Sequence, residues 1–407
     1  MTREPHLQMG TNLPKVGHYN RAVVLEAIQV SDGISRVQIA EHSGLTPQTV
    51  SVIVRKLLHD GLVYEDGSLP SQGGKPRTIL RVAPTAVYAL GIHFDPAETT
   101  HVLTDLTGHP VARLRTGPMT GPDSTPETVL REMARAARRM LREAGVPDGK
   151  VLGAGLACPG PLDAAGAMSA PPRLPGWDGV PVKRLLERHI GLPVTVDNDA
   201  TAAAIGERWA GIARATPSFA YLYLGTGIGG GLFLDNQVYR GRSGNAGEFG
   251  HITVLPDGPE CYCGNRGCVE AVCCPSAIEA AVRSRLAAGA PSTLPPAPGH
   301  AAICAAALAG DPPAREVIEL VAARLADAAV SIVNMLDIDL LVLGGPASQQ
   351  VGPLYHAVVA GAVASRPLAR RLHRTRVELS PLTADAAAIG AASLVLHSAY
   401  SPRLLAP

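Results

Sequence analysis

The stretch Gly241–Glu270 reads GRSGNAGEFGHITVLPDGPECYCGNRGCVE, and the rest of the chain is organised around it. Three thiols and one imidazole fall within eighteen positions, a set of donors that suits one tetrahedral zinc ion. The four candidate ligands are His251, Cys261, Cys263 and Cys268. Because protein side chains fill all four positions, the pattern predicts a structural zinc site rather than a catalytic one.

Two carboxylates bracket this metal group, Glu248 before it and Glu270 after it. Zinc prefers sulfur and nitrogen in such a set, so both carboxylates are available to another ligand. Carboxylates accept hydrogen bonds, and we therefore expect a polyhydroxylated ligand beside the metal loop. His251 can bind the metal through one ring nitrogen and face that ligand with the other. The alternative is that both carboxylates are solvated surface charges.

The composition bounds the class of protein. A chain of 407 residues suggests two or three domains. Its formal net charge is +1, so any contact with nucleic acid must be local. Neither a signal-peptide pattern nor a run of about 18 apolar residues is present, which predicts a soluble cytoplasmic protein with no membrane partner. The seven cysteines are odd in number and clustered, which favours metal binding over disulfides.

The first 83 residues contain a pattern typical of a small DNA-binding domain. Thr46-Pro47 predicts a helix start, with a hydroxyl at the cap and proline at the first position. Apolar residues then recur at helical spacing, at Val50, Ile53, Val54, Leu57 and Leu58. Two short strands follow, with the basic-tipped segment 66–77 between them. We expect a mobile arm at residues 1–17 and a winged helix-turn-helix at 18–83.

The polar face of this helix and the wing supply candidate contacts to operator DNA. Amide, hydroxyl and basic side chains read base edges and phosphates. The candidates are Gln48, Thr49, Ser51, Arg55 and Lys56 on the helix, and Lys75 and Arg77 on the wing. The alternative is a small helical protein-interaction domain, because this segment is only mildly basic.

Beyond residue 83 the pattern alternates between strands and helices, which predicts an α/β architecture. A strand at 192–196 leads into Asn198-Asp199 at the start of a helix. A glycine-rich loop, Gly225–Gly231, lies between two strands. It is therefore neither a P-loop nor a Rossmann fingerprint, and a tight hairpin would need the same glycines.

The opening stretch resembles the signature of the ROK family of repressors, open reading frames and sugar kinases. That family carries a GxxGxAGExGH run followed by CxCGxxGCxE, and every fixed letter is present here. Residues 36–63 also resemble the helix-turn-helix of ROK repressors. The resemblance implies a two-lobed actin-like ATPase (ribonuclease H-like) fold preceded by an α+β winged helix-turn-helix domain. It places lobe 1 at 84–198 and lobe 2 at 199–407, with a closing helix that packs back on lobe 1.

The resemblance also implies roles for individual residues. In family kinases the NDA motif holds the catalytic aspartate, which is Asp199 in this sequence. The implied sugar contacts are Asn198, Asp199, Glu248, His251 and Glu270. Implied nucleotide-site positions are Gly225, Thr226, Gly227, Gly344 and Gly345.

The first phosphate turn departs from the family pattern. The family reads DxGGTx there, whereas this chain has Asp95-Pro96-Ala97-Glu98-Thr99-Thr100. Ala97 adds a β-carbon and Glu98 a negative charge where the family has two glycines, and both oppose phosphate binding. We therefore expect a vestigial nucleotide site and no enzyme activity.

These features favour a transcription regulator, a repressor of sugar-metabolism genes. It would bind operator DNA and a sugar effector as a homodimer or homotetramer. An ATP-dependent kinase of hexoses or N-acetylhexosamines with a regulatory DNA-binding head is the alternative. A third possibility is a DNA-bound scaffold whose sugar site is vestigial.

Overall fold

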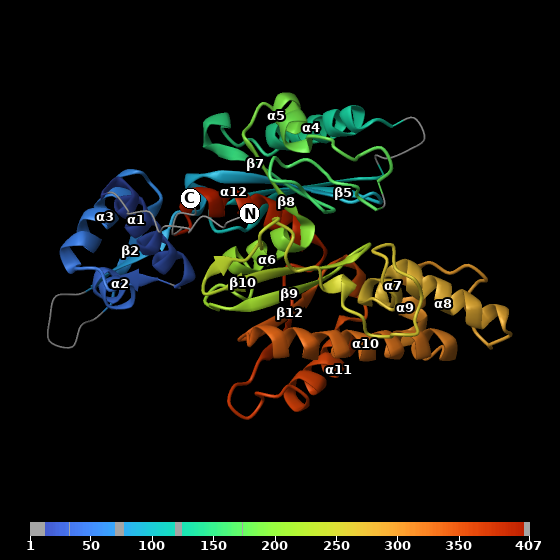
Figure 1. Cartoon of the computed structure of the whole chain (residues 1–407). Helices are drawn as coiled ribbons and strands as arrows, with labels where there is room; N and C mark the ends of the chain where they lie inside the picture. Colours follow the sequence, from blue (N-terminus) through green and yellow to red (C-terminus); the bar gives the residue numbers. More distant parts are fainter. Residues whose placement is uncertain (1–12, 32, 70–76, 119–123, 173, 403–407) are drawn as a thin grey trace, which may run out of the picture. The chain divides into compact units, whose positions relative to one another are not determined.

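The computed structural model describes residues 13–31, 33–69, 77–118, 124–172 and 174–402, which form two compact units (Figure 1). The first unit contains the described residues up to Tyr88, Asp105–Thr107 and the chain from Leu396 onward. The second contains Ala89–Thr104 and Gly108–Val395. Within these described ranges, no helix is long and apolar enough to cross a membrane.

The first unit is a winged helix-turn-helix. Its helices are α1 (Leu13–Val30), α2 (Arg36–Ser43) and α3 (Pro47–His59). Its strands are β1 (Ile34–Ser35), β2 (Val63–Leu69) and β3 (Arg77–Val82), which form an antiparallel sheet in the order β1-β3-β2. The tip of the wing, including Lys75, lies outside the described residues.

Local capping explains where these helices begin. Ser35 and Gln38 form a reciprocal capping box at the start of α2, and Gly44 ends that helix in a left-handed conformation. The Thr46 hydroxyl accepts the Thr49 amide at the start of α3. Val50, Val54 and Leu57 are fully buried on the inner face of α3. The turn between α2 and α3 is therefore fixed by the sequence on both sides.

The prediction of a mobile arm over residues 1–17 is wrong in its last part. Helix α1 begins at Leu13 and runs through Gly17 without interruption. Gly17 lies inside this helix, and one glycine costs a helix only about 1 kcal/mol, which tertiary packing outweighs. Residues 1–12 lie outside the described residues.

The second unit contains two five-stranded sheets. The first has the order β6-β5-β4-β7-β8. Its strands are β4 (Tyr88–Phe94), β5 (Thr99–Asp105), β6 (Pro110–Thr116), β7 (Val151–Cys158) and β8 (Val194–Asn198). Helices α4 (Pro126–Glu143) and α5 (Val182–Ile190) pack against each other and cover one face of this sheet (Figure 1).

The second sheet has the order β11-β10-β9-β12-β13. Its strands are β9 (Phe219–Leu224), β10 (Ile228–Leu234), β11 (Gln237–Val238), β12 (Leu340–Gly344) and β13 (Arg376–Leu379). Helices α7 (Val269–Cys273), α8 (Pro275–Ala287), α9 (His300–Leu308), α10 (Pro312–Leu336) and α11 (Gly352–Ser365) follow the metal loop or connect these strands. The sequence predicts an irregular connection around one short helix over 281–314, and the irregular residues 288–299 followed by α9 agree with this, although α8 extends to Ala287.

Both faces of the second sheet are buried, as the apolar run of β9 requires. Phe219, Tyr221 and Tyr223 point to the core shared with α6 (Asp199–Trp209) and α12 (Ala386–Tyr400). The alternate residues Ala220 and Leu222 point to the core formed with α10. Strand β9 is thus a central strand between two helical layers.

Helix α12 packs closely on the first sheet and on α6. A β-carbon at Gly91 of β4 or Gly155 of β7 would collide with the backbone carbonyls of Ala388 or Ala391. Gly390 likewise approaches the backbone of α6 at Ala202. Glycine and alanine at these positions let the backbones approach, and the carboxyl end of β8 is thereby set beside the second sheet.

Candidate functional site

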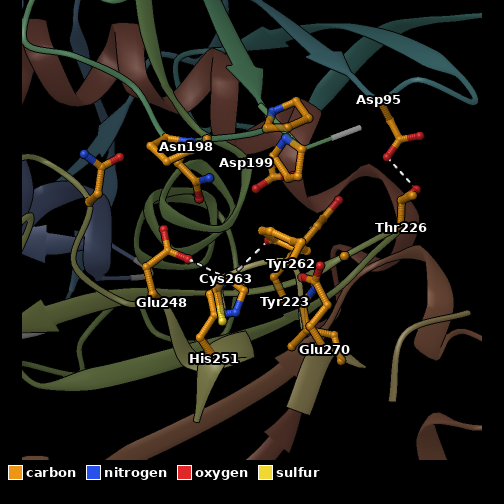
Figure 2. A pocket seen from close by; sticks show the side chains of 18 of the residues that line it. Asp95, Asn198, Asp199, Tyr223, Thr226, Glu248, His251, Tyr262, Cys263 and Glu270 are labelled. Carbon is orange, nitrogen blue, oxygen red and sulfur yellow. Dashed lines mark hydrogen bonds and ion pairs between the residues drawn. The ribbon is translucent and has the colours of Figure 1, made fainter. Parts of the chain in front are cut away.

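A cavity of about 520 Å³ lies in the second unit, between loops that follow strands of both sheets (Figure 2). Its polar lining comes from separate parts of the sequence. The titratable and amide side chains are Asp95, Asn198, Asp199, Tyr223, Asn245, Glu248, His251, Tyr262, Cys263 and Glu270. All five residues expected to bind sugar are among them. Carboxylate and amide oxygens predominate, so the cavity favours a ligand with many hydrogen-bond donors.

Asn198 and Asp199 stand where β8 ends and α6 begins. The side-chain oxygen of Asn198 accepts the amide of Ala200 at 2.9 Å and so caps α6. One carboxylate oxygen of Asp199 accepts the same amide at 2.8 Å. These bonds hold both side chains at the wall of the cavity, each with further hydrogen-bonding capacity for a ligand.

The Asp199 carboxyl has an unusual pKa. Burial raises the pKa to about 7, and the charges of Asp95, Glu248 and Glu270 act in the same direction. The hydrogen bond from Ala200 opposes this shift. A carboxyl with a pKa near neutrality is suited to accept a proton from a hydroxyl group.

The metal group is assembled as its spacing predicts. The ligand atoms of His251, Cys261, Cys263 and Cys268 all lie within 4.8 Å of one another. The Sγ atoms of Cys263 and Cys268 are 3.7 Å apart, and Nδ1 of His251 is 3.5 Å from Sγ of Cys261. Bonds of about 2.0–2.3 Å to a tetrahedral centre give separations of this size. The residues present therefore fit a metal ion.

His251 connects the metal group to the cavity. Its Nδ1 faces the thiols, whereas Nε2 lies 3.1 Å from the Tyr262 hydroxyl and 3.9 Å from Oε2 of Glu248 (Figure 2). Burial is the main cause that raises the pKa of Glu248, and neighbouring Glu270 raises it further. The metal loop thus carries the ring whose second nitrogen lies at the cavity wall.

Glu270 is buried on α7 and reaches the glycine-rich loop. Its Oε2 accepts the amide of Ile228 at 2.8 Å. A β-carbon at Gly227 would approach this carboxylate to 2.8 Å, so glycine gives the loop room to pass. The conformation of the glycine-rich loop therefore depends on the position of Glu270, which follows the metal ligand Cys268 in the sequence.

The turn Asp95–Glu98 is closed by its own hydrogen bonds. The backbone groups of Asp95 and Glu98 bond to each other in both directions, at 3.1 and 3.2 Å. The Ala97 amide donates to Oδ1 of Asp95 at 2.9 Å, and Pro96 has no amide hydrogen. Every amide of the turn is therefore used or missing, and none is left to bind a phosphate oxygen.

The structure corrects the reason given above for weak phosphate binding. Glu98 does not line the cavity; its carboxylate accepts the Thr100 hydroxyl and pairs with Arg115 at 3.4 Å. The carboxylate that lines the cavity here is Asp95, and its Oδ2 accepts the Thr226 hydroxyl at 2.7 Å (Figure 2). The phosphate turn and the glycine-rich loop are thus joined directly.

The remaining nucleotide-site glycines serve close packing. Gly344 ends β12, and a β-carbon there would collide with the Tyr221 hydroxyl. Gly345 has φ of +106° and approaches the backbone of Leu224. Gly225 and Thr226 line a second hollow that also contains Pro346 and His300. The structure brings the two glycine loops close together. Glycine is required at these positions because a β-carbon would collide with neighbouring atoms.

The candidate DNA contacts lie in the first unit. Gln48, Arg55 and Lys56 are exposed on α3, and Arg77 is exposed at the start of β3. Thr49 and Ser51 are less available, because Thr49 bonds the Thr46 hydroxyl and Ser51 donates to the Pro47 carbonyl. Val52, which the sequence interpretation omitted, is 49% exposed on the same helix.

Sequence reasoning also missed three side chains of the cavity region. Tyr262 lies between two metal ligands, a position from which its proximity was predictable. Asn245 bonds both backbone groups of Leu162, at 3.0 and 3.1 Å. Arg240 pairs with buried Asp197 at 2.6 Å, next to Asn198. For the last two, the partners are too distant in sequence for any local pattern to reveal them.

Known proteins are similar to this chain over most of its length. A model described as "ROK family" matches residues 90–398, and one described as "Winged helix-turn-helix DNA-binding" matches residues 23–64. The chain is 28% identical to the N-acetylglucosamine repressor of Escherichia coli O6:H1, over 100% of this chain and 98% of that protein. It is 27% identical to the xylose repressor of Caldicellulosiruptor bescii, over 94% and 96%.

A solved enzyme structure is similar to the second unit. The ROK hexokinase of Thermus thermophilus is 31% identical, with a TM-score of 0.60, and covers 75% of this chain and 97% of its own. Similar proteins thus include repressors and a kinase, so membership alone does not decide activity. The family match spans most of the chain, and the protein belongs to the ROK family, with a winged helix-turn-helix domain at its N-terminus.

Proposed function

We propose that this protein is a sugar-responsive transcription regulator, a repressor without sugar kinase activity. One observation carries the proposal: an acceptor-rich cavity is retained, while the adjoining phosphate turn is closed by its own hydrogen bonds. A sensor needs the cavity but not the phosphate turn, whereas a kinase needs both. The similar repressors of xylose and N-acetylglucosamine are consistent with this division.

Operator binding is assigned to α3 and the wing. The exposed side chains Gln48 and Arg55 are suited to base edges, and Lys56 and Arg77 to phosphates. Exposed Val52 adds an apolar group that can contact a thymine methyl. Lys75 is assigned to the wing contact on its sequence position alone.

The sugar and the metal have adjoining sites in this proposal. Asn198, Asp199, Glu248 and Glu270 accept hydrogen bonds from sugar hydroxyls, and Nε2 of His251 completes the set. Zinc, held by His251 and the three thiols, would fix the loop that carries these groups. Binding of a sugar would close the two lobes, and in a homodimer this changes the spacing of the two DNA-binding domains.

A direct test combines DNA selection with a sugar panel. Duplexes selected from a random pool by the purified protein are titrated by fluorescence anisotropy, with and without aldoses and N-acetylhexosamines. We expect at least one sugar to raise the melting temperature and weaken operator binding, without sugar-dependent release of ADP from ATP. The proposal fails if no sugar in the panel alters operator affinity.

The kinase remains the second candidate, because Asp199 titrates near neutrality and the glycine-rich loop is intact. Its signature would be ADP release that depends on the sugar and is lost in Asp199→Asn. That result would replace the first proposal.

A further inference from the structure

Tyr262 belongs to the metal loop and also lines the cavity. It stands between the metal ligands Cys261 and Cys263, so the metal group holds its backbone while its side chain can still change rotamer. Tyr262 is 59% exposed, and its ring meets the His251 ring edge-on, with the ring centroids 5.2 Å apart (Figure 2). The side chain of Tyr262 therefore has room to leave the cavity wall without a movement of the loop.

The Tyr262 hydroxyl bonds groups that the proposed function assigns to a sugar. It lies 3.1 Å from Nε2 of His251. Because Nδ1 faces the thiols and would bind the metal, the ring proton stays on Nε2, which donates to the Tyr262 oxygen. Burial raises the pKa of Tyr262, and the charges of Glu270 and Glu248 and a hydrogen bond with Glu270 raise it further. The phenol thus accepts from an imidazole and donates to a carboxylate, as a sugar hydroxyl in the same place would.

The Nε2 nitrogen of His251 has one hydrogen and therefore serves one acceptor well. A hydrogen bond weakens steeply when its angle falls below about 120°, so two acceptors cannot share this hydrogen at full strength. The Glu248 carboxylate lies 3.9 Å from the same nitrogen, which is beyond hydrogen-bond distance. Tyr262 is thus the group that bonds Nε2 in this structure, and a sugar oxygen placed at His251 would compete with it.

From this competition we infer that the Tyr262 hydroxyl takes the place of one sugar hydroxyl when no effector is bound, and that the effector displaces it from His251. This inference rests on the proposed function and adds a residue that sets the affinity for the effector. Only the fraction of molecules in which Tyr262 has left His251 binds the sugar fully. The hydroxyl therefore raises the sugar concentration at which the protein responds.

Tyr262→Phe tests the inference, since it removes the hydroxyl and keeps the ring. Sugar affinity is measured by calorimetry on the full-length protein with a panel of aldoses and N-acetylhexosamines. We expect the sugar that binds to do so about 5-fold more tightly in Tyr262→Phe, because one competing hydrogen bond is lost. The matched control Tyr239→Phe removes an exposed tyrosine hydroxyl of the same unit outside the cavity lining, and should leave the affinity unchanged.

An affinity in Tyr262→Phe that equals the wild-type value overturns the inference. A weaker affinity also overturns it, because the hydroxyl would then contact the sugar directly. Metal content should be the same in both proteins, and a loss of metal from Tyr262→Phe would show that the hydroxyl supports the loop instead of competing with the sugar.

Nuclear magnetic resonance of isotope-labelled tyrosine rings follows the displacement itself. The Tyr262 signal is identified by its absence from the spectrum of Tyr262→Phe. A saturating concentration of the sugar should shift this signal, and a signal that keeps its position contradicts displacement. If no sugar binds to the wild type or to Tyr262→Phe, the proposed function fails, and this inference fails with it.

Discussion

The Asp199 carboxyl lies in an environment that disfavours its ionised form. Its pKa is raised from 3.8 to about 7, chiefly by burial. In the unfolded chain the group ionises near its usual pKa, so the folded state is penalised as the pH rises from about 4 to 7. The stability associated with the neutral form is therefore complete below about pH 4 and lost as the pH passes 7.

Substitution of Asp199 by asparagine should remove this penalty. The Asn variant should melt at a higher temperature than the wild type in the absence of ligand. The gap should widen between about pH 4.5 and 7.5 and then level off, reaching a few kcal/mol at most because the cavity admits water. Thermal unfolding across that pH range measures the gap. A gap that is constant with pH would show that the Asp199 pKa is not raised.

For individual residues, the sequence indicated which side chains belong to the site but not which hydrogen bonds and ion pairs they form. The loss of glycine at Ala97 and Glu98 was visible in the sequence. It did not reveal that Glu98 turns to Arg115 while Asp95 lines the cavity and bonds Thr226. Those contacts depend on how strands far apart in the sequence are aligned, which no local pattern specifies.

Among the elements, α3 is the one whose surface should decide operator affinity. Arg55 is exposed there, in the C-terminal half of the helix whose first turn carries Gln48. Arg55→Ala should weaken binding to the selected operator by about 10-fold or more, the usual cost of one lost arginine contact. Arg138→Ala, an exposed position on α4, is the matched control. Equal affinities for both variants in anisotropy titrations would move the DNA contact away from α3.

The metal loop is the second element for which a substitution should have a specific effect. Cys268→Ser should lower the melting temperature and abolish the response to sugar, because His251 and Glu270 lose the support that positions them. Operator binding should persist, since the DNA-binding domain has its own buried core at Val50, Val54 and Leu57. Cys274→Ala tests a buried thiol outside the metal group. Metal content measured on both variants should fall only in Cys268→Ser.

Elements with strong periodicity were predictable, and those with weak signals were not. The apolar stripe and caps of α3 marked its position closely. The bounds of α8 and α9 were poorly marked, because their alanine-rich sequences show little amphipathic contrast between flanking glycines and prolines. Strand β1 has two residues and is defined only by its pairing with β3. Pairing of this kind is tertiary information.

On the scale of the second unit as a whole, specific side chains link the two lobes. Asp95 of the β4–β5 turn bonds Thr226, Asp197 of β8 pairs with Arg240, and Asn245 bonds the loop at Leu162. Asp95, Thr226 and Asn245 line the cavity in which Asp199 lies, and Asp197 precedes its lining residue Asn198. A ligand that contacts both lobes would therefore stabilise the same arrangement of the lobes as these side-chain links.

Thr226→Val tests this cooperation with a substitution of equal size. The variant cannot donate to Asp95, so the sugar must hold the lobes together with one link fewer. Sugar affinity should fall about 5-fold, the usual worth of one such hydrogen bond. Thermodynamic linkage then requires a second result. The factor by which sugar weakens operator binding must equal the factor by which operator weakens sugar binding. This equality must hold in the wild type and in the variant. Calorimetry of the sugar with and without operator, set beside anisotropy of the operator with and without sugar, yields both factors. If Thr226→Val leaves sugar affinity unchanged, the Asp95–Thr226 bond does not contribute to ligand-driven closure.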